Sequence, residues 1–267
     1  SGDLTNNSGL GLFASVPGSV IMNGTAQVIG GSDRTNFDDL TLYCATLDLQ
    51  QDMAVGGTYA VPSGTLALND AMVHLNSNML LVNNGLSSAI TRNNGQIVSE
   101  TDPILGYGDV QWLIRSNGGL YTVPFGDGLN YLPVLLNITA AATTSGSFHF
   151  ATYPTDPFAT PNNRPLPTGL SALTDLAGIE NAPNVLDRFW IISTEEYPMD
   201  PVATLTFTYR DGEWPTGPNT IVESALQAQR FDGVHWSNPP IAVVKTTKNT
   251  VTTTPTNTLH IIWAPPH

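Results

Sequence analysis

The residues best suited to acid–base or metal chemistry are few and scattered along the chain. Its five histidines are His74, His149, His235, His260 and His267. None of them falls in an H-x-x-x-H, H-x-H or H-E-x-x-H arrangement, the spacings that bring two imidazoles to one zinc ion. His149 and His260 alternate with apolar residues in strand-like segments, where an outward-facing side chain is the ordinary interpretation. The sequence therefore predicts no metal site.

Carboxylates offer a second kind of chemistry, because a glycosidase requires only two of them facing each other across a cleft. The candidates are Asp187, Glu195, Glu196, Asp200, Asp211 and Glu213. We interpret Asp187, which precedes Arg188, as part of a structural ion pair or as a strand cap. The segment Asp211-Gly-Glu213 is typical of a hairpin turn, as are Asp127-Gly128 and Asp232-Gly233. None of these patterns nominates a catalytic pair.

Other reaction classes leave no clear pattern either. The chain has no G-x-S-x-G elbow for an acyl-transfer serine and no D-x-[DN]-x-[DN]-G calcium loop. We therefore predict that the protein is not an enzyme and has no catalytic, cofactor-binding or metal-ligating residues. A calcium ion held by an acidic loop is the one cofactor left open.

Tryptophans could instead form a platform on which sugar rings stack. The five are Trp112, Trp190, Trp214, Trp236 and Trp263. Four of them lie inside or at the ends of predicted strands, where packing in the core is the more ordinary use. Trp214 lies in a predicted turn and is the best exposed candidate. An exposed Trp214 beside Tyr209 or Trp236 in a groove would favour a carbohydrate-binding module.

The elements that would position these side chains are strands. Helix signals are limited to short stretches around Ser171–Leu176 and Val222–Gln227. Closely spaced strands are expected in the first part of the chain, separated by Gly, Asn and Pro turns, at Leu40–Tyr43, Leu47–Leu49, Thr58–Val61, Thr65–Leu68, Met72–Leu75, Met79–Val82 and Gln96–Val98. This spacing suits a β-solenoid or a narrow two-sheet sandwich, although no strict repeat length is visible.

The charged and Gly/Pro-containing segment at residues 99–108 indicates a domain boundary. The strands expected after it are longer and more aromatic, at Val110–Ile114, Leu120–Pro124, Tyr131–Ile138, Ser147–Thr152, Arg188–Ser193, Val202–Tyr209, Ala225–Phe231, Ile241–Lys245 and Leu259–Trp263. They predict a β-sandwich with one long irregular loop from Tyr153 to Pro183. We thus predict an all-β protein with a solenoid-like region at residues 1–105 and a sandwich at residues 106–267.

Composition excludes several classes of partner. The 267 residues carry 9 Lys and Arg against 22 Asp and Glu, a formal net charge of −13. This balance argues against nucleic acid and anionic membranes, and the apolar runs are too short to span a bilayer. The single cysteine, Cys44, is expected to be a buried small hydrophobe. Low charge and the start at Ser1 favour a mature secreted protein.

Several motifs, weak alone, form a more specific set because of their order. They are Gly119-Leu-Tyr-Thr-Val-Pro-Phe-Gly126 with Tyr131-Leu-Pro133, Asp187-Arg-Phe-Trp190, Thr204–Tyr209 and Arg230-Phe-Asp-Gly-Val-His-Trp236. Together with Phe37-Asp-Asp-Leu-Thr-Leu42, this set resembles secreted surface proteins of Bacteroidota, adhesin-like β-sandwich proteins that often leave the cell by type IX secretion. No recognisable sorting domain follows Trp263. We expect that this signal has been removed or that the protein is exported differently.

The resemblance implies a non-catalytic structural or adhesive protein at a bacterial surface. We expect other copies of the chain to be its main partners. An extended arm at residues 1–18 could add a strand to a neighbouring subunit and build a filament, and Lys245–Thr258 is a second candidate contact. The alternatives are a carbohydrate-binding module of a secreted surface protein and, less favoured, a glycan-active enzyme.

Overall fold

Short runs of alternating apolar residues form strands throughout the chain. In Leu40-Thr-Leu42, Leu47-Asp-Leu49 and Leu66-Ala-Leu68 the leucines are buried and the residues between them are partly exposed. This is the two-residue period of a strand with one face against a core. The computed structural model describes residues 2–8, 18–58, 62–100, 106–174, 177–231, 236 and 242–257, and the backbone of 261–264.

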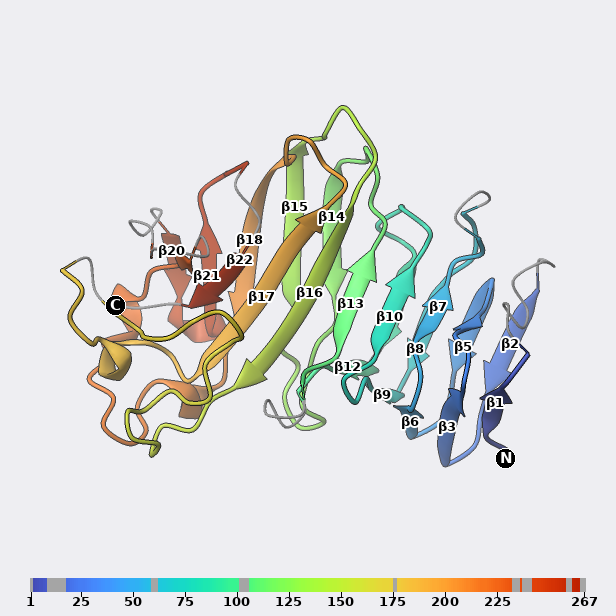
Figure 1. Cartoon of the computed structure of the whole chain (residues 1–267), viewed down its shortest axis with the longest axis horizontal. Helices are drawn as coiled ribbons and strands as arrows, with labels where there is room; N and C mark the ends of the chain where they lie inside the picture. Colours follow the sequence, from blue (N-terminus) through green and yellow to red (C-terminus); the bar gives the residue numbers. More distant parts are fainter. Residues whose placement is uncertain are drawn as a thin grey trace.

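The first half of the chain winds into a parallel β-solenoid of about three turns with three faces (Figure 1). One side sheet contains β1 (Leu4–Asn6), β3 (Ala26–Gly31), β6 (Thr46–Leu49), β9 (Met72–His74) and β12 (Gln96–Val98). The other contains β2 (Ser19–Met22), β5 (Asp39–Leu42), β8 (Leu66–Asn69) and β11 (Ile90–Asn93). The third face contains β4 (Thr35–Asn36), β7 (Met53–Val55), β10 (Met79–Val82) and β13 (Asp109–Trp112). Of the two predicted arrangements, the solenoid is the one observed.

Successive coils differ in length, which explains why the sequence shows no strict repeat. In one side sheet Ser19 pairs with Asp39, a spacing of 20 residues. Leu66 pairs with both Leu40 and Ile90, at spacings of 26 and 24 residues. The strands stay in register while the corners between them vary. Aligned leucine and isoleucine side chains therefore stack inside the solenoid even though no period marks them in the sequence.

The third face of the solenoid continues into the second half of the protein. β13 pairs in parallel with β10 on one side and antiparallel with β16 (Ser147–Pro154) on the other. The sheet then continues through β17 (Arg188–Glu195), β22 (Ile261–Ala264) and β19 (Gln229–Phe231). We call this eight-stranded sheet the long sheet. Strand direction changes close to the boundary predicted at residues 99–108, but the sheet itself is continuous.

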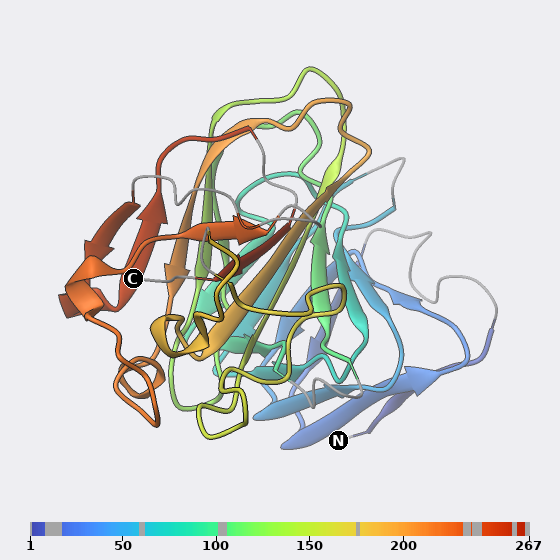
Figure 2. The same ribbon diagram turned by 60° about the vertical axis from the view of Figure 1, so that its left-hand side comes forward.

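A further five-stranded sheet faces the second half of the long sheet (Figures 1 and 2). Its strands, in order, are β14 (Gly119–Val123), β15 (Val134–Ala140), β18 (Val202–Thr208), β21 (Thr250–Thr253) and β20 (Ala242–Lys245). Trp190 of β17 contacts Phe207 of β18, with ring centroids 5.1 Å apart. The second half thus has two facing sheets, one of which also belongs to the solenoid.

The irregular segment predicted between Tyr153 and Pro183 is packed against the end of the sheets. Tyr153, Leu173 and Phe189 belong to a small apolar cluster separate from the main core. Buried Asn163 donates to the carbonyls of Ala182 and Val185, and its Oδ1 accepts from Thr155 Oγ1 at 2.6 Å. These bonds satisfy backbone groups that no sheet covers.

Some local predictions were wrong in detail. Val222–Gln227 contains only the 3₁₀ helix η3 (Glu223–Ala225), and the described residues 171–174 form no helix. The strand expected at Ala225–Phe231 begins only at Gln229. Several strands were not predicted, among them β3, β7, β11 and β21. Of Thr58–Val61 only Thr58 is described, and it lies outside any strand.

The two segments expected to contact other copies pair within their own chain where they are described. From the predicted arm, Leu4–Asn6 forms β1 and pairs in parallel with β3, while residues 1 and 9–17 lie outside the described part. From the second segment, β21 lies between β18 and β20, and η4 (Thr246–Lys248) turns between β20 and β21. β21 is therefore paired on both sides, whereas β1 is paired on one side only.

Candidate functional site

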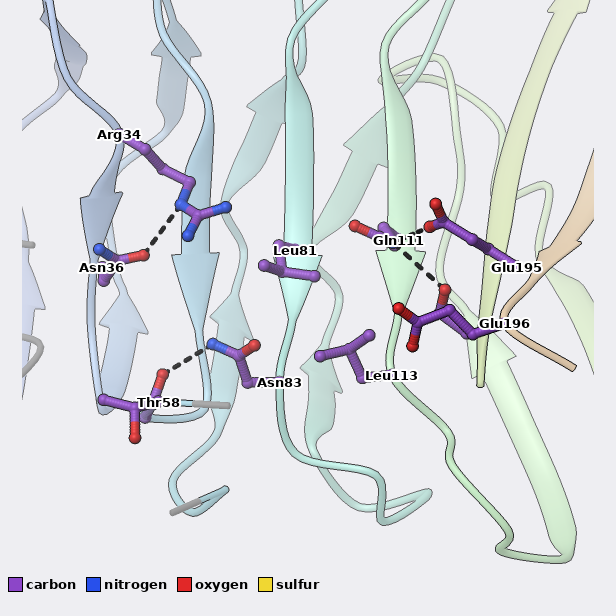
Figure 3. A pocket seen from close by; sticks show the side chains of 11 residues that line it. Arg34, Asn36, Thr58, Leu81, Asn83, Gln111, Leu113, Glu195 and Glu196 are labelled. Carbon is purple, nitrogen blue, oxygen red and sulfur yellow. Dashed lines mark hydrogen bonds between the residues drawn. The ribbon is translucent and has the colours of Figure 1, made fainter. Parts of the chain in front are cut away.

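A groove of about 340 Å³ crosses the outer face of the long sheet, where the solenoid strands meet β16 and the end of β17 (Figure 3). Its lining combines amides, hydroxyls, charges and two leucines: Arg34, Asn36, Gly57, Thr58, Leu81, Asn83, Gln111, Leu113, Ser147, Glu195 and Glu196. The groove lies across the strands. Each strand therefore contributes one or two side chains to it.

The middle of the groove has an apolar floor. Ala54, Leu81 and Leu113 pack together as a cluster distinct from the main core, and partly buried Met79 joins them. In β7 and β10 the alternate residues, such as Met53 and Leu80, point into the solenoid. Leu81 and Leu113 keep only 7% and 8% of their surface exposed. A face that would normally be polar thus carries a small apolar strip.

One end of the groove is basic. Arg34 and Asn36 come from one edge of the long sheet, and Arg34 Nε donates to Asn36 Oδ1 at 3.0 Å. The Arg34 side chain extends toward Leu81 (Figure 3) and is exposed. Below it, Asn83 Nδ2 donates to the carbonyl of Gly57 at 2.7 Å.

The other end of the groove is acidic. Adjacent residues in a regular strand point to opposite faces, yet Glu195 and Glu196 both line the groove. The reason is that β17 ends at Glu195, and Glu196 has a φ of 66°. A left-handed conformation is unusual for a residue other than glycine and costs about 1 kcal/mol. This turn places two carboxylates side by side.

His149 links the acidic end of the groove to the neighbouring strand. Its Nδ1 lies 2.6 Å from Asp109 Oδ2, and its Nε2 lies 3.4 Å from Glu195 Oε2. Burial alone would lower the pKa of His149. Hydrogen bonds and charge interactions with Asp109 and Glu195 outweigh that effect and raise it. Gln111 Nε2 donates to Glu195 Oε2 at 2.9 Å and to Ser147 Oγ at 3.2 Å.

A second cavity, of about 360 Å³, contains Asp187, Arg210, Asp211 and Glu213 among its lining residues. Of the two interpretations of Asp187, the ion pair with Arg188 was wrong, because Arg188 pairs with Glu100 and Glu213. Asp187 directly precedes β17, the position expected of a strand cap. Asp187 Oδ2 accepts from Asn219 Nδ2 at 2.8 Å. Burial raises the pKa of Asp187 to about 7, and the nearby carboxylate of Glu213 adds to the increase.

Arg188 is fully buried in an ionic network next to this cavity. Its guanidinium lies 2.6 Å from Glu100 Oε1 and 2.8 Å from Glu213 Oε1. Glu213 also pairs with Arg210, which reaches Asp127 at 2.7 Å. Asp211–Glu213 forms the 3₁₀ helix η2 rather than the predicted hairpin turn, and this helix brings Glu213 to both arginines. Asp127 does lie in the predicted turn, where its Oδ1 accepts from the backbone N–H groups of Leu129 and Asn130.

The tryptophan platform, the alternative to core packing, is not formed by the described residues. Trp112 and Trp190 are fully buried, as expected for core residues. Trp214 is only partly exposed and packs against the main core. Tyr209, the expected partner of Trp214 in a groove, is buried. Trp236 packs on Phe231, with ring centroids 5.4 Å apart. The side chain of Trp263 lies outside the described part.

The remaining candidate residues from the sequence analysis, where they are described, lie outside both cavities. Cys44 is free and buried, as predicted. Asp200 accepts a hydrogen bond from Thr194 at 2.7 Å. His74 is half-buried on β9. The histidines His235, His260 and His267 lie outside the described part, as does the expected turn Asp232-Gly233. Among the described residues no group of three or more His, Cys, Asp or Glu side chains is arranged to hold a metal ion.

Most residues of the groove were missed from the sequence. Glu195 and Glu196 were among the carboxylate candidates, but Arg34, Asn36, Asn83 and Gln111 were not. Their only signal is a polar residue at an outward position of a strand, which is ordinary on any exposed sheet.

Within the part of the chain that is described, no helix is both long and apolar enough to span a bilayer. Comparisons with known protein families, curated proteins and solved structures found no match.

Proposed function

We propose that the protein is a non-catalytic adhesive protein of the bacterial surface that binds an oligosaccharide across the long sheet. The observation that carries this proposal is the groove lined by Arg34, Asn36, Asn83, Gln111 and Glu195. Amide, hydroxyl and charged side chains at fixed spacing are suited to a ligand rich in hydroxyl groups. The leucine strip between them suits the apolar faces of sugar rings.

The size of the groove supports an extended ligand. From β4 to β17 the long sheet contains five inter-strand spacings. At about 4.8 Å each, they amount to about 24 Å. A chain of several sugars laid across the strands would meet side chains from each of them. Such a binding mode needs no tryptophan platform, because hydrogen bonds and the leucine floor supply the contacts.

The position of the carboxylates favours binding over hydrolysis. A glycosidase holds its two carboxylates on opposite sides of the scissile bond. Here Glu195 and Glu196 lie together at one end, and the opposite end is formed by Arg34 and Asn36 (Figure 3). An adhesive role at the surface agrees with the predicted secretion and the low content of charged residues.

Titration of the isotope-labelled protein with neutral and acidic oligosaccharides, followed by NMR, tests this proposal. We expect chemical-shift changes confined to the groove, and we expect N36A to weaken binding about fivefold through loss of a hydrogen bond. N137A is the matched control, because Asn137 is exposed on β15 of the other sheet. Perturbations spread over the surface, or equal losses in both variants, would refute a groove site.

Self-assembly is a second candidate function, favoured by the open end of the solenoid. Among the described residues, β1, β2 and β4 each pair on one side only and form the edges of their sheets. Ile21 on β2 is 60% exposed. Unpaired edges of this kind can accept strands from another copy. Light scattering and negative-stain microscopy would detect oligomers or fibres.

A charged substitution distinguishes the solenoid end from other edges. We expect I21K to dissolve such assemblies, because charge on an edge strand opposes strand pairing. V243K is the control, since Val243 is similarly exposed on β20, the edge of the other sheet. A monomer at all concentrations, or assemblies that survive I21K, would exclude this mode of assembly.

A further inference from the structure

The charges of the groove are separated along its length. At one end Arg34 donates from Nε to Asn36, and its two terminal nitrogens extend over the groove (Figure 3). In the described part of the chain Arg34 has no acidic partner within ion-pair distance. Other arginines are engaged: Arg188 and Arg210 bind carboxylates, and Arg92 stacks on Tyr131. Among the described residues, nothing acidic competes with a ligand for the terminal nitrogens of Arg34.

The opposite end carries an excess of negative charge. Glu195 and Glu196 both line this end, and the one imidazole beside them, that of His149, is shared between Glu195 and Asp109. An anionic group placed at this end would meet like charges at short range, which destabilises a complex. The formal net charge of −13 also repels a ligand that is anionic along its whole length. The two ends of the groove therefore select for different chemical groups.

We propose that the groove binds an oligosaccharide with one acidic group, a carboxylate or a sulfate, at Arg34 and uncharged sugars toward Glu195 and Glu196. This inference rests on the proposed function and specifies its ligand. A guanidinium holds such an anion by two parallel N–H···O bonds. Gln111, Asn83 and the leucine floor then face uncharged sugars, whose hydroxyl groups donate to the carboxylates of Glu195 and Glu196.

The test compares four probes by isothermal titration calorimetry with the full chain. Sialyllactose has one terminal carboxylate, sulfated lactose has one sulfate, lactose is the neutral counterpart, and trigalacturonate is charged on every sugar. We expect the singly charged probes to bind about five- to tenfold more tightly than lactose, as one partly exposed charged hydrogen-bond pair predicts. Comparing sialyllactose with sulfated lactose shows which anion is preferred. Trigalacturonate should bind no more tightly than lactose.

Variants assign the preference to the two ends of the groove. R34Q should bring sialyllactose to the affinity of lactose, and R34K should restore part of the difference because it keeps the charge but not the planar fork. K248Q is the control: it changes the net charge equally, and Lys248 lies in η4, outside the groove. The double variant E195Q/E196Q should improve trigalacturonate binding several-fold.

The outcomes separate this inference from the proposed function. If neither sialyllactose nor sulfated lactose binds more tightly than lactose in the wild type, or if R34Q leaves the ratio of charged to neutral probe unchanged, the acidic-group assignment is wrong while the groove remains a sugar site. If K248Q abolishes the preference as strongly as R34Q, long-range charge and not the Arg34 contact is responsible, which also overturns it. If none of the four probes binds, both proposals fail.

Discussion

At the scale of single residues, His149 shows how a strand position becomes part of a charged site. An outward-facing histidine was expected, and its neighbours on β13 and β17 add two carboxylates within reach. The raised pKa of His149 means that the folded protein holds this proton more tightly than the unfolded chain does. The resulting stabilisation is present below about pH 6.5 and is lost as the pH rises through the raised pKa.

We therefore expect H149Q to be less stable than the wild type at pH 6 by about 0.5–1 kcal/mol, the range for partly exposed ion pairs. The difference should shrink toward pH 9, as the wild-type imidazole loses its proton. Urea unfolding at the two pH values measures it, with H74Q as a control on β9 in a side sheet. A loss that is the same at both pH values would indicate packing and not charge.

Asp187 illustrates the opposite case of an acid that folding makes harder to ionise. The residue is 2% exposed, and burial raises the pKa of its carboxyl group to about 7. Below about pH 4 both the folded and unfolded forms are protonated, so the group has no effect on stability. As the pH rises from 4 to 7 the unfolded chain ionises first, and the folded protein loses stability.

D187N removes this penalty and should be more stable than the wild type by about 1–3 kcal/mol at pH 8, but not at pH 4. Thermal unfolding across this pH range provides the measurement. D211N serves as the control because Asp211 lines the same cavity but is exposed. The explanation fails if D187N is less stable than the wild type at pH 8.

At the scale of elements, the corners of the solenoid depend on residues with no side chain. A β-carbon on Gly108 would lie 2.1 Å from the β-carbon of Leu75, which is fully buried. Gly108 leads into β13, the strand that joins the solenoid to the rest of the long sheet. Neither the backbone at Gly108 nor the Leu75 side chain can move aside without disturbing the packing of the solenoid core.

We expect G108A to lower the free energy of unfolding by about 1–3 kcal/mol, the usual cost of overpacking. Gly118 is a suitable control, because a β-carbon there would have its nearest neighbour at 3.5 Å, an ordinary contact. Urea unfolding of G108A and G118A gives the comparison. Equal stability of the two variants would mean that the corner is more adaptable than its close contact indicates.

At the scale of the whole molecule, one core extends through both halves. It includes Met22 and Leu47 in the solenoid and Leu205 and Val251 in the second half, and the long sheet is continuous between them. Two regions that share a sheet and a core should unfold together. The predicted division between residues 105 and 106 then marks a change in strand arrangement, and not a boundary between two units that unfold separately.

Two spectroscopic probes can test this coupling, because all five tryptophans follow residue 111. Trp112 lies on β13 at the junction and the other four follow it, so fluorescence reports mainly on the second half. Far-ultraviolet circular dichroism reports on all strands. For L47A, which removes a buried side chain from the solenoid at a cost of about 2–5 kcal/mol, both signals should shift to lower urea together. L205A is the matching change in the second half. Early loss of dichroism with unchanged fluorescence in L47A would indicate independent halves.

The sequence alone was sufficient for the all-β class, the solenoid-like first part and the long irregular segment. Alternating apolar residues and Gly, Asn and Pro turns act over a few neighbouring residues, so they can be read directly; β10 and β12 were placed at their observed bounds. β3 was missed because its apolar core is short and ends in two glycines, and β7 because it has only 3 residues and no alternation.

The candidate site was decided only by the tertiary structure. Arg34, Asn83, Gln111 and Glu195 are far apart in the sequence, and unequal coil lengths conceal which residues lie side by side. The left-handed turn at Glu196 and the partner of Arg188 also depend on contacts between distant strands. Local pattern fixes which face of a strand a residue occupies. Register between strands, set by the packing of the whole core, fixes which residues meet there.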